Sequence, residues 1–396
     1  MLCTLRNLVI GMLGLGLLST LSACGGGGSG GYGGSGGGGL PTDQSPLVGY
    51  SYSVEAGTSV SSPGNVLAVA IHADGSGGTS TTLSGVTGSN PQPPALATVG
   101  GIGYLFVPSA VSGNLTVFQV NGSSLVQIGG AISLSYSPQE NAIAVMSGPY
   151  LVLGDDQGNI HVYPVVAGGS IGVETTYSTV SSTYAITGIA ASKDNKYLLV
   201  EGRGTGSNTN IEFFEFSIGT GGHLTPVGST VLPDTYFNYS NLVADPSTAN
   251  GDYFYSGGTN GFYLVSASAS GPTATVLFTP TDGGGEWDFI GWIDPTGTWV
   301  YVDAWDSHTS AYTFDQFSIR TTGQTSYVGT EPNCNPANTA ASFQGTYNAS
   351  QGFVLFSAEG TPVCSYNAIG GILTKPVQTP GSFDPGMGPF GIMSAS

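Results

Sequence analysis

The sequence feature that most limits the fold is a β-strand pattern that repeats about every 45 to 50 residues. Each copy has an apolar strand, a turn with Asp-Pro, Ser-Pro or Lys-Asp, a Tyr-rich strand, a Gly/Asn loop and two further strands. The clearest copies are Gly188–Val200, Leu242–Ser256 and Ile290–Val302. No helical periodicity of apolar residues persists beyond a turn after Leu47. The chain is therefore expected to be all-β.

A repeat of this length is typical of the blades of a β-propeller, and strand counting predicts a single propeller of seven four-stranded antiparallel blades. Three strands in residues 47–86 and a last strand in Gly388–Ser396 complete each other as blade one, so both termini close the ring. Closure removes the exposed sheet edges of an open array. Two β-sandwich domains are the alternative, although no linker is visible at residues 200–240. Blades two to seven are expected at 93–130, 141–178, 185–232, 240–279, 288–329 and 340–378.

The three clearest repeats resemble the lactonase and YVTN class of seven-bladed β-propellers, whose blades have an apolar strand, a Pro-Asp-Gly-type turn and then Tyr-Val. The resemblance extends over most of residues 47–396, while residues 93–180 lack a clear turn signature. It implies a site on the top face of the ring. The loops that lead into the inner strands and the loops between second and third strands converge there.

The N-terminus has the pattern of an export signal. Arg6 precedes an apolar run, Leu8–Leu18, that is too short to span a bilayer. Leu21-Ser22-Ala23-Cys24 follows and resembles the lipobox of bacterial lipoproteins. The resemblance implies a signal peptide at residues 1–23 and lipid on Cys24. The alternatives are an ordinary secretory signal with an accidental cysteine and an uncleaved anchor.

Residues 24–39 are expected to form the lipidated cysteine and a flexible Gly/Ser linker, followed by the propeller domain at residues 40–396. The membrane would be a partner through the lipid on Cys24. The residue after Cys24 is Gly25. An Asp at this position would resemble an inner-membrane retention signal, so the glycine favours the outer membrane or cell surface.

The charge balance argues against nucleic acid as a partner. The chain has 6 Lys and Arg against 24 Asp and Glu, a net charge of −18, and loss of Arg6 with the signal would make it −19. Phosphate backbones need the opposite sign. Charged residues are only 8% of the chain, so Ser, Thr, Asn, Gln and Gly must supply much of the surface, which suits an exported protein.

Two cysteines remain after the signal and the lipidated residue are set aside. Cys334 and Cys364 are predicted to form a disulfide in an oxidising compartment. The alternative is a metal pair, but the sequence offers no nearby His or Cys ligands. No metal site and no cofactor are predicted.

The favoured hypothesis is a non-catalytic binding or scaffold module for an envelope protein, peptide or glycan. Its contacts would come from aromatic and acidic residues expected in top-face loops, because aromatic rings beside carboxylates suit sugars and peptides. For the tryptophans, packing against neighbouring side chains is the alternative interpretation. The candidate residues are Tyr236, Tyr239, Glu286, Trp287, Asp288 and Trp305.

An enzyme is the alternative. The family resemblance suggests a lactone hydrolase similar to propellers of the 6-phosphogluconolactonase type, with Glu286 or His308 as base and Arg203 stabilising the oxyanion or carboxylate. His161 and His223 are expected in solvated positions on or beside outer strands. Asp155–Asn159 faintly resembles a calcium loop but is predicted to be a tight turn.

Overall fold

The computed structural model divides the chain into two units, Met1–Gln44 and Ser45–Ser396. All described elements belong to the second unit. The described residues are 46–55, 59, 61–72, 77–179, 184–204, 210–232, 242–247, 252–258, 261–278, 285–294, 296–306, 311–332, 344–348, 353–357, 364–367, 373–378 and 391–394.

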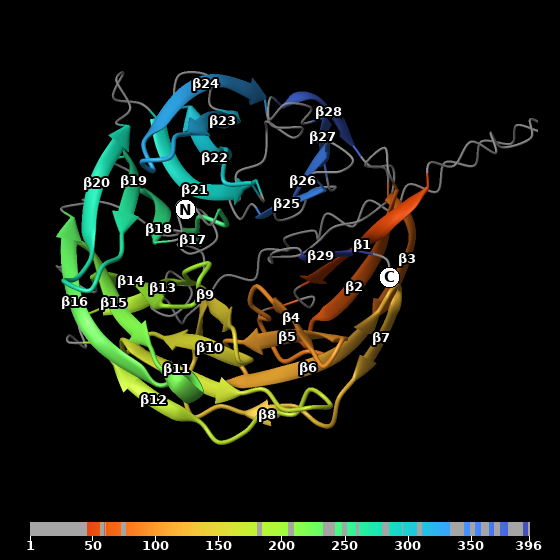
Figure 1. Ribbon diagram of the computed structural model, residues 1–396. Helices are drawn as coiled ribbons and strands as arrows, with labels where there is room; N and C mark the ends of the chain where they lie inside the picture. The colour runs from red at the N-terminus through yellow and green to blue at the C-terminus, as the bar shows by residue number, and fades with distance from the viewer. Residues whose placement is uncertain are drawn as a thin grey trace, which may run out of the picture. The chain divides into compact units, whose positions relative to one another are not determined.

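The strands of the second unit form seven antiparallel sheets, here called blades 1 to 7 (Figure 1). The strands of each blade are given from the inner strand outward. Blade 1 contains β29 (Gly391–Ser394), β1 (Leu47–Glu55), β2 (Asn65–His72) and β3 (Gly77–Leu83). Blade 2 contains β4 (Ala95–Val99), β5 (Ile102–Ser109), β6 (Asn114–Asn121) and β7 (Ser124–Gln127), and β8 (Ile132–Ser133) also pairs with β6. Blade 3 contains β9 (Pro138–Met146), β10 (Tyr150–Asp155), β11 (Asn159–Pro164) and β12 (Thr175–Ser178).

Blades 4 to 7 repeat this order. Blade 4 contains β13 (Tyr184–Ala191), β14 (Tyr197–Gly204), β15 (Ile211–Ile218) and β16 (Leu224–Leu232), with a short 3-10 helix at Thr220–Gly222. Blade 5 contains β17 (Val243–Ala244), β18 (Tyr253–Gly258), β19 (Gly261–Ser266) and β20 (Thr273–Phe278). Blade 6 contains β21 (Gly285–Ile293), β22 (Trp299–Asp306), β23 (Ala311–Ile319) and β24 (Thr325–Pro332). Blade 7 contains β25 (Gln344–Asn348), β26 (Phe353–Ser357), β27 (Cys364–Asn367) and β28 (Thr374–Gln378).

Each blade contacts the next one along the chain, and β25 of blade 7 contacts β29 of blade 1. β29 pairs with β1 from Gly391 opposite Tyr52 to Ser394 opposite Gly49, so strands from the two ends of the domain share a sheet. This pairing confirms closure by both termini. The all-β propeller class is confirmed, and the alternative of two β-sandwich domains is wrong, because the sheets follow one another around a ring (Figure 1).

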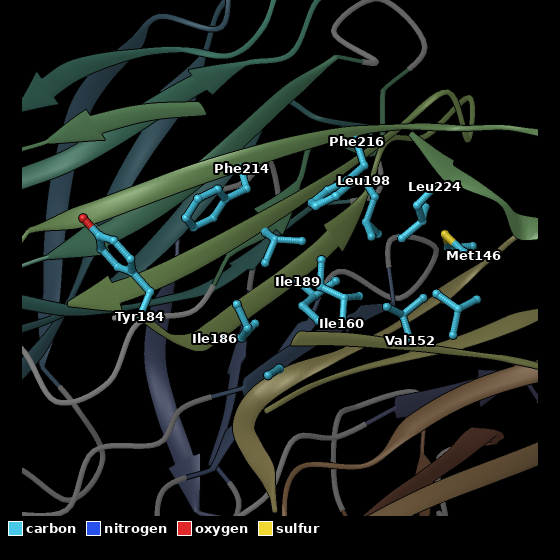
Figure 2. Packing of buried hydrophobic residues seen from close by; sticks show 13 residues of the cluster. Met146, Val152, Ile160, Tyr184, Ile186, Ile189, Leu198, Phe214, Phe216 and Leu224 are labelled. Atoms are coloured by element: carbon cyan, nitrogen blue, oxygen red, sulfur yellow. The ribbon is translucent and has the colours of Figure 1, made fainter. Parts of the chain in front are cut away.

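Apolar side chains between neighbouring blades hold the ring together. Between blades 3 and 4, Met146, Val152 and Ile160 pack against Ile186 and Leu198 (Figure 2). All five residues are fully buried. Burial of one such side chain stabilises the fold by about 1.5 to 3 kcal/mol. Alternation along each strand places one set of side chains against each neighbouring blade.

The repeated turn predicted from the sequence follows the inner strands of blades 4, 5 and 6. A polar side chain caps it each time: Ser192, Asp245 and Asp294. Ser192 Oγ accepts hydrogen bonds from the backbone N–H groups of Lys196 (3.1 Å) and Tyr197 (3.0 Å). Asn195 takes the left-handed conformation that closes this turn, with φ of 57°.

The strand directions define two ends of the ring. Inner strands begin and second strands finish at one end, here called the top end; the turns capped by Ser192, Asp245 and Asp294 lie at the bottom end. In blade 4, Tyr184 at the start of β13 lies opposite Gly204 at the end of β14.

Two connections between blades are short: Ser178 to Tyr184 between blades 3 and 4, and Phe278 to Gly285 between blades 5 and 6. About five or six linking residues cannot both cross to the next inner strand and reach the opposite end. Across blades 4 and 5, Ser268 N, just after β19, donates to Glu215 Oε1 towards the bottom end of β15 (3.1 Å). Across blades 6 and 7, Leu373 N, just before β28, donates to Gln316 Oε1 towards the bottom end of β23 (2.9 Å). The top ends of blades 3 to 7 therefore lie on one side.

Candidate functional site

Three inner strands are irregular near the top end. In β13, Ile186 pairs with Gly202 and Gly188 with Glu201, so Thr187 is an extra residue in a β-bulge. In β21, pairing shifts between Glu286 and Phe289, and in β9 it shifts between Pro138 and Ile143. Bulges redirect side chains and are frequent beside active sites. The irregular inner strands therefore mark the top end of blades 3, 4 and 6 as the candidate site.

A buried charged cluster lies at this end between blades 4 and 5. We call Thr187, Glu201, Arg203 and Ser256 the arginine cluster. Glu201 is fully buried, and its Oε1 accepts hydrogen bonds from Arg203 Nη2 (3.4 Å) and the Thr187 hydroxyl (3.2 Å). Its Oε2 accepts one from the Ser256 hydroxyl (2.6 Å). The bulge at Thr187 places that hydroxyl on the side of Glu201, and Ser256 ties the carboxylate to the next blade.

Arg203 is two residues beyond Glu201 on β14 and therefore on the same face of the strand. Its side chain keeps 11% exposure, while that of Glu201 has none. A planar guanidinium with several donors is suited to oxygen anions. The arrangement therefore holds a cation at the top end of β14, on a carboxylate that is itself fixed by two hydroxyls.

Four sequence-predicted contacts lie in strands and not in loops, which corrects the expectation. Glu286, Trp287 and Asp288 are in β21, and Trp305 is in β22, directly opposite Glu286. The physical reason is the strong β-propensity of aromatic residues, which extends both strands to the top end. The expected position at the top end is retained, because these residues occupy the start of the inner strand and the end of the second.

All but one of the other predicted residues lie outside the described part of the chain. Tyr236, Tyr239, His308, Cys24 and Cys334 are outside it, and Cys364 is the first residue of β27. The disulfide and the lipid site stay predictions.

A second charged cluster lies at the top end of blade 3. We call Tyr136, Asp155, His161, Tyr163 and Glu174 the histidine cluster. The expectation of a solvated His161 is wrong, because the residue is 4% exposed. Its Nδ1 lies 2.7 Å from Glu174 Oε1 and its Nε2 lies 3.1 Å from Asp155 Oδ2. Tyr136 stacks on the imidazole ring with centroids 3.4 Å apart.

The histidine cluster is closed by further hydrogen bonds. Tyr163 donates its hydroxyl to Glu174 Oε2 (2.8 Å), and the hydroxyls of Tyr136 and Tyr163 are 2.8 Å apart. Burial raises the pKa of Tyr136 and of Tyr163. Burial would also raise the pKa of Asp155 and Glu174, but hydrogen bonds from His161 and other donors outweigh it and lower both pKa values.

Asp155 shows that Asp155–Asn159 is a turn, as predicted. Its Oδ1 accepts hydrogen bonds from the backbone N–H groups of Gln157 (2.9 Å) and Asn159 (2.7 Å). Gly158 takes a positive φ of 79°. The carboxylate is thus used by the turn and by His161.

Among the described residues, no group of three or more His, Cys, Asp or Glu side chains could hold a metal ion. The same part of the chain has no helix that is long and apolar enough to cross a membrane.

Comparison with known proteins identifies the fold only. No family model and no curated protein matches the sequence. Solved structures that match include a Lactobacillus plantarum protein with 13% identity, TM-score 0.63, and coverage of 88% of this chain and 100% of that one. A Pseudomonas aeruginosa periplasmic gluconolactonase has 16% identity, TM-score 0.62, and coverage of 88% and 99%. A Bacteroides fragilis protein described as a putative 6-phosphogluconolactonase has 16% identity, TM-score 0.61, and coverage of 89% of this chain and 99% of that one.

These structural neighbours are lactonase-like propellers, in agreement with the resemblance found in the repeats. Sequence reasoning selected Arg203 and missed the residues that surround it. Glu201 could have been selected from the sequence, because it precedes Arg203 by two residues and alternate residues of a strand share a face. Thr187 and Ser256 carried no such signal, because a bulge and a contact between blades place them.

Proposed function

We propose that this chain is a lactone hydrolase that acts at the top end of the propeller. The observation that carries the proposal is the arginine cluster, in which a carboxylate with no exposure holds Arg203 at the end of a second strand. The names of two structural neighbours, a gluconolactonase and a 6-phosphogluconolactonase, support the same reaction class. At such identities a shared fold alone is a poor guide to activity, so the site must carry the argument.

The reaction needs an anion-stabilising group and a base. Water adds to the lactone carbonyl carbon while a base takes its proton, and negative charge develops on the carbonyl oxygen. The ring C–O bond then breaks, the ring oxygen takes a proton, and a hydroxy acid forms. Arg203 would stabilise the developing oxyanion, an effect that is largest when the cation is fixed beforehand. Glu201 would act as a positioning residue for Arg203.

Glu286 and His308 are the proposed bases. Glu286 begins the irregular part of β21, so the backbone supports a position at the top end of the next-but-one blade. His308 follows β22 in the sequence and is proposed on that ground alone. Either group can take a proton from water near neutral pH when its surroundings are suitable.

The test compares the two arginines of the propeller, Arg203 and Arg320. The full chain is assayed against a panel of sugar lactones, with spontaneous hydrolysis in buffer subtracted. Arg203→Gln should lower kcat by about 100-fold or more, as loss of an oxyanion donor does in other enzymes. Arg320→Gln is the matched control, because Arg320 is exposed in the turn after β23, at the bottom end. It should leave kcat unchanged.

Two further variants separate folding from catalysis. Arg203→Gln leaves Glu201 buried without its cation, so Arg203→Gln combined with Glu201→Gln restores a neutral pair and tests whether the loss of activity persists. Absence of turnover by the wild-type chain above buffer would remove the proposal. Saturable binding of a glycan or peptide without turnover would favour the non-catalytic envelope-binding module with contacts at Tyr236, Tyr239, Trp287 and Trp305.

A further inference from the structure

The distribution of positive charge about the ring is uneven. The chain has six Lys and Arg residues: Arg6, Lys193, Lys196, Arg203, Arg320 and Lys375. Arg6 is in the first unit and lies outside the described residues. The strand order assigns each of the other five to one end of the propeller. The Lys and Arg residues that could contact a ligand at the top end can therefore be counted.

Only Arg203 among these five lies at the top end. Lys193 and Lys196 are in the turn between β13 and β14, which is at the bottom end. Arg320 is in the turn between β23 and β24, also at the bottom end. Lys375 is the second residue of β28, whose first residue lies opposite Asn367 at the bottom end of β27.

The charge of Arg203 is already matched. Its guanidinium is paired with Glu201, and that carboxylate has no exposure through which water could screen it. His161, the described histidine at the top end, lies between the carboxylates of Asp155 and Glu174. The surrounding field is also negative, since the chain carries a net charge of −18. Among the described residues, a ligand with a phosphate group would find no second Lys or Arg at the top end.

We infer that the site at the top end takes lactones without a phosphate group and discriminates against phosphorylated sugar lactones. The inference rests on the proposed function and names its substrate class. One arginine suffices for a neutral lactone, because only one negative oxygen develops during the reaction. A phosphomonoester adds a charge of nearly −2 that stays on the ligand throughout, so its field opposes both binding and reaction.

The experiment measures kcat/KM of the full chain for gluconolactone and for 6-phosphogluconolactone. The neutral lactone should be favoured by about 10-fold to 100-fold at low salt. High salt should narrow the ratio by raising kcat/KM of the phosphorylated substrate only, because salt screens repulsion between exposed charges. Equal kcat/KM values, a preference for the phosphorylated lactone, or a ratio unaffected by salt would overturn the inference while leaving the hydrolase proposal intact.

If the chain hydrolyses neither lactone, the proposed function is wrong. Discrimination against a phosphate group is then tested by ligand binding. Gluconate and 6-phosphogluconate are then compared by the thermal shift each produces in the full chain. A shift with gluconate that is absent with 6-phosphogluconate supports exclusion of phosphate. An equal or larger shift with 6-phosphogluconate contradicts it. Arg320→Lys, at the bottom end, serves as the control whose shifts should equal those of the wild type.

Discussion

The histidine cluster and the arginine cluster both bury charge at the top end, but they are assembled differently. In the histidine cluster, no two hydrogen-bonded residues are more than 27 positions apart, and all lie in blade 3 or the segment that leads into it. In the arginine cluster, Glu201 and Ser256 are 55 residues apart and belong to neighbouring blades. Short-range partners stabilise a blade by itself, whereas the arginine cluster joins blades 4 and 5 through their second strands, β14 and β18.

The difference separates a stabilising network from a candidate site. The ring nitrogens of His161 are both taken up by carboxylates, and its ring face is covered by Tyr136. Such a ring has no nitrogen with which to take a proton from water. Arg203 donates to the carboxylate of Glu201 through a planar guanidinium with several donors, on β14 beside the irregular inner strand β13. Variants of Glu201 and His161 test this distinction, and variants elsewhere in the propeller serve as comparisons.

The largest effect is expected for Glu201→Leu. The substitution leaves Arg203 without its carboxylate and removes the acceptor of Thr187 and Ser256. Breaking a buried pair in this way lowers the free energy of unfolding by about 3 to 5 kcal/mol. Urea unfolding of the full chain measures the change, with Glu201→Gln as the shape-preserving control and a smaller loss. A change below about 1 kcal/mol would mean that the cluster does not join the blades.

Glu215→Gln should act in the opposite direction. Glu215 is 1% exposed between blades 4 and 5 and shares one backbone donor, Ser268 N, between its two oxygens at 3.1 and 3.2 Å. Burial, with a smaller contribution from Asp252, raises the pKa of Glu215 to about 7. The folded state thus prefers the protonated acid, and its stability falls as pH rises from the ordinary Glu pKa of 4.5 through 7.

The neutral amide removes this loss. Glu215→Gln should raise the free energy of unfolding at pH 8 by up to about 3 kcal/mol and leave it unchanged near pH 4. Urea unfolding at both pH values measures the difference. Glu212→Gln, on the same strand, is the control, because the Ser229 hydroxyl donates to that carboxylate at 2.6 Å. A gain of equal size at both pH values would show that charge is not the cause.

His161→Phe should lower the free energy of unfolding by about 2 kcal/mol, since Asp155 and Glu174 each lose one donor to a charged group. Asp155 keeps the two backbone donors of its turn, which limits the loss. The lowered pKa values of both carboxylates mean that they stabilise the fold above pH 4.5 and lose this contribution as pH falls through their folded-state values. The variant should therefore differ from wild type less at pH 3 than at pH 7.

The same variant tests the separation of roles. Lactone hydrolysis by His161→Phe should equal that of the wild type at a temperature where both are folded. A loss of kcat as large as that of Arg203→Gln would place the histidine cluster in the site and remove the distinction drawn above.

The fold could be predicted further from the sequence than the site. Strand alternation and the turn repeat are local, so the predicted limits of blade 4, 185–232, lie close to the observed Tyr184–Leu232. The burial of His161 could not be predicted, because Tyr136 comes from another connection and the ring depends on two carboxylates that only the folded blade brings together. The extension of β21 through Trp287 was likewise missed, since turn residues in Asp282–Gly285 suggested a longer loop.

The smallest effect is expected at the bottom end, in the turn of blade 4. Ser192→Ala removes the acceptor of two backbone N–H groups and should lower the free energy of unfolding by about 1 kcal/mol, the usual net value of a neutral hydrogen bond. Asp294→Ala removes a buried carboxylate that accepts from Thr298 N (2.6 Å) and Trp299 N (2.7 Å), so its loss should be larger than that of Ser192→Ala. Neither residue is near the top end, and both variants should retain wild-type kcat/KM in the lactone assay. If either variant changes substrate preference while it is fully folded in the assay, the two ends of the propeller are coupled, and the assignment of the site to the arginine cluster alone is wrong.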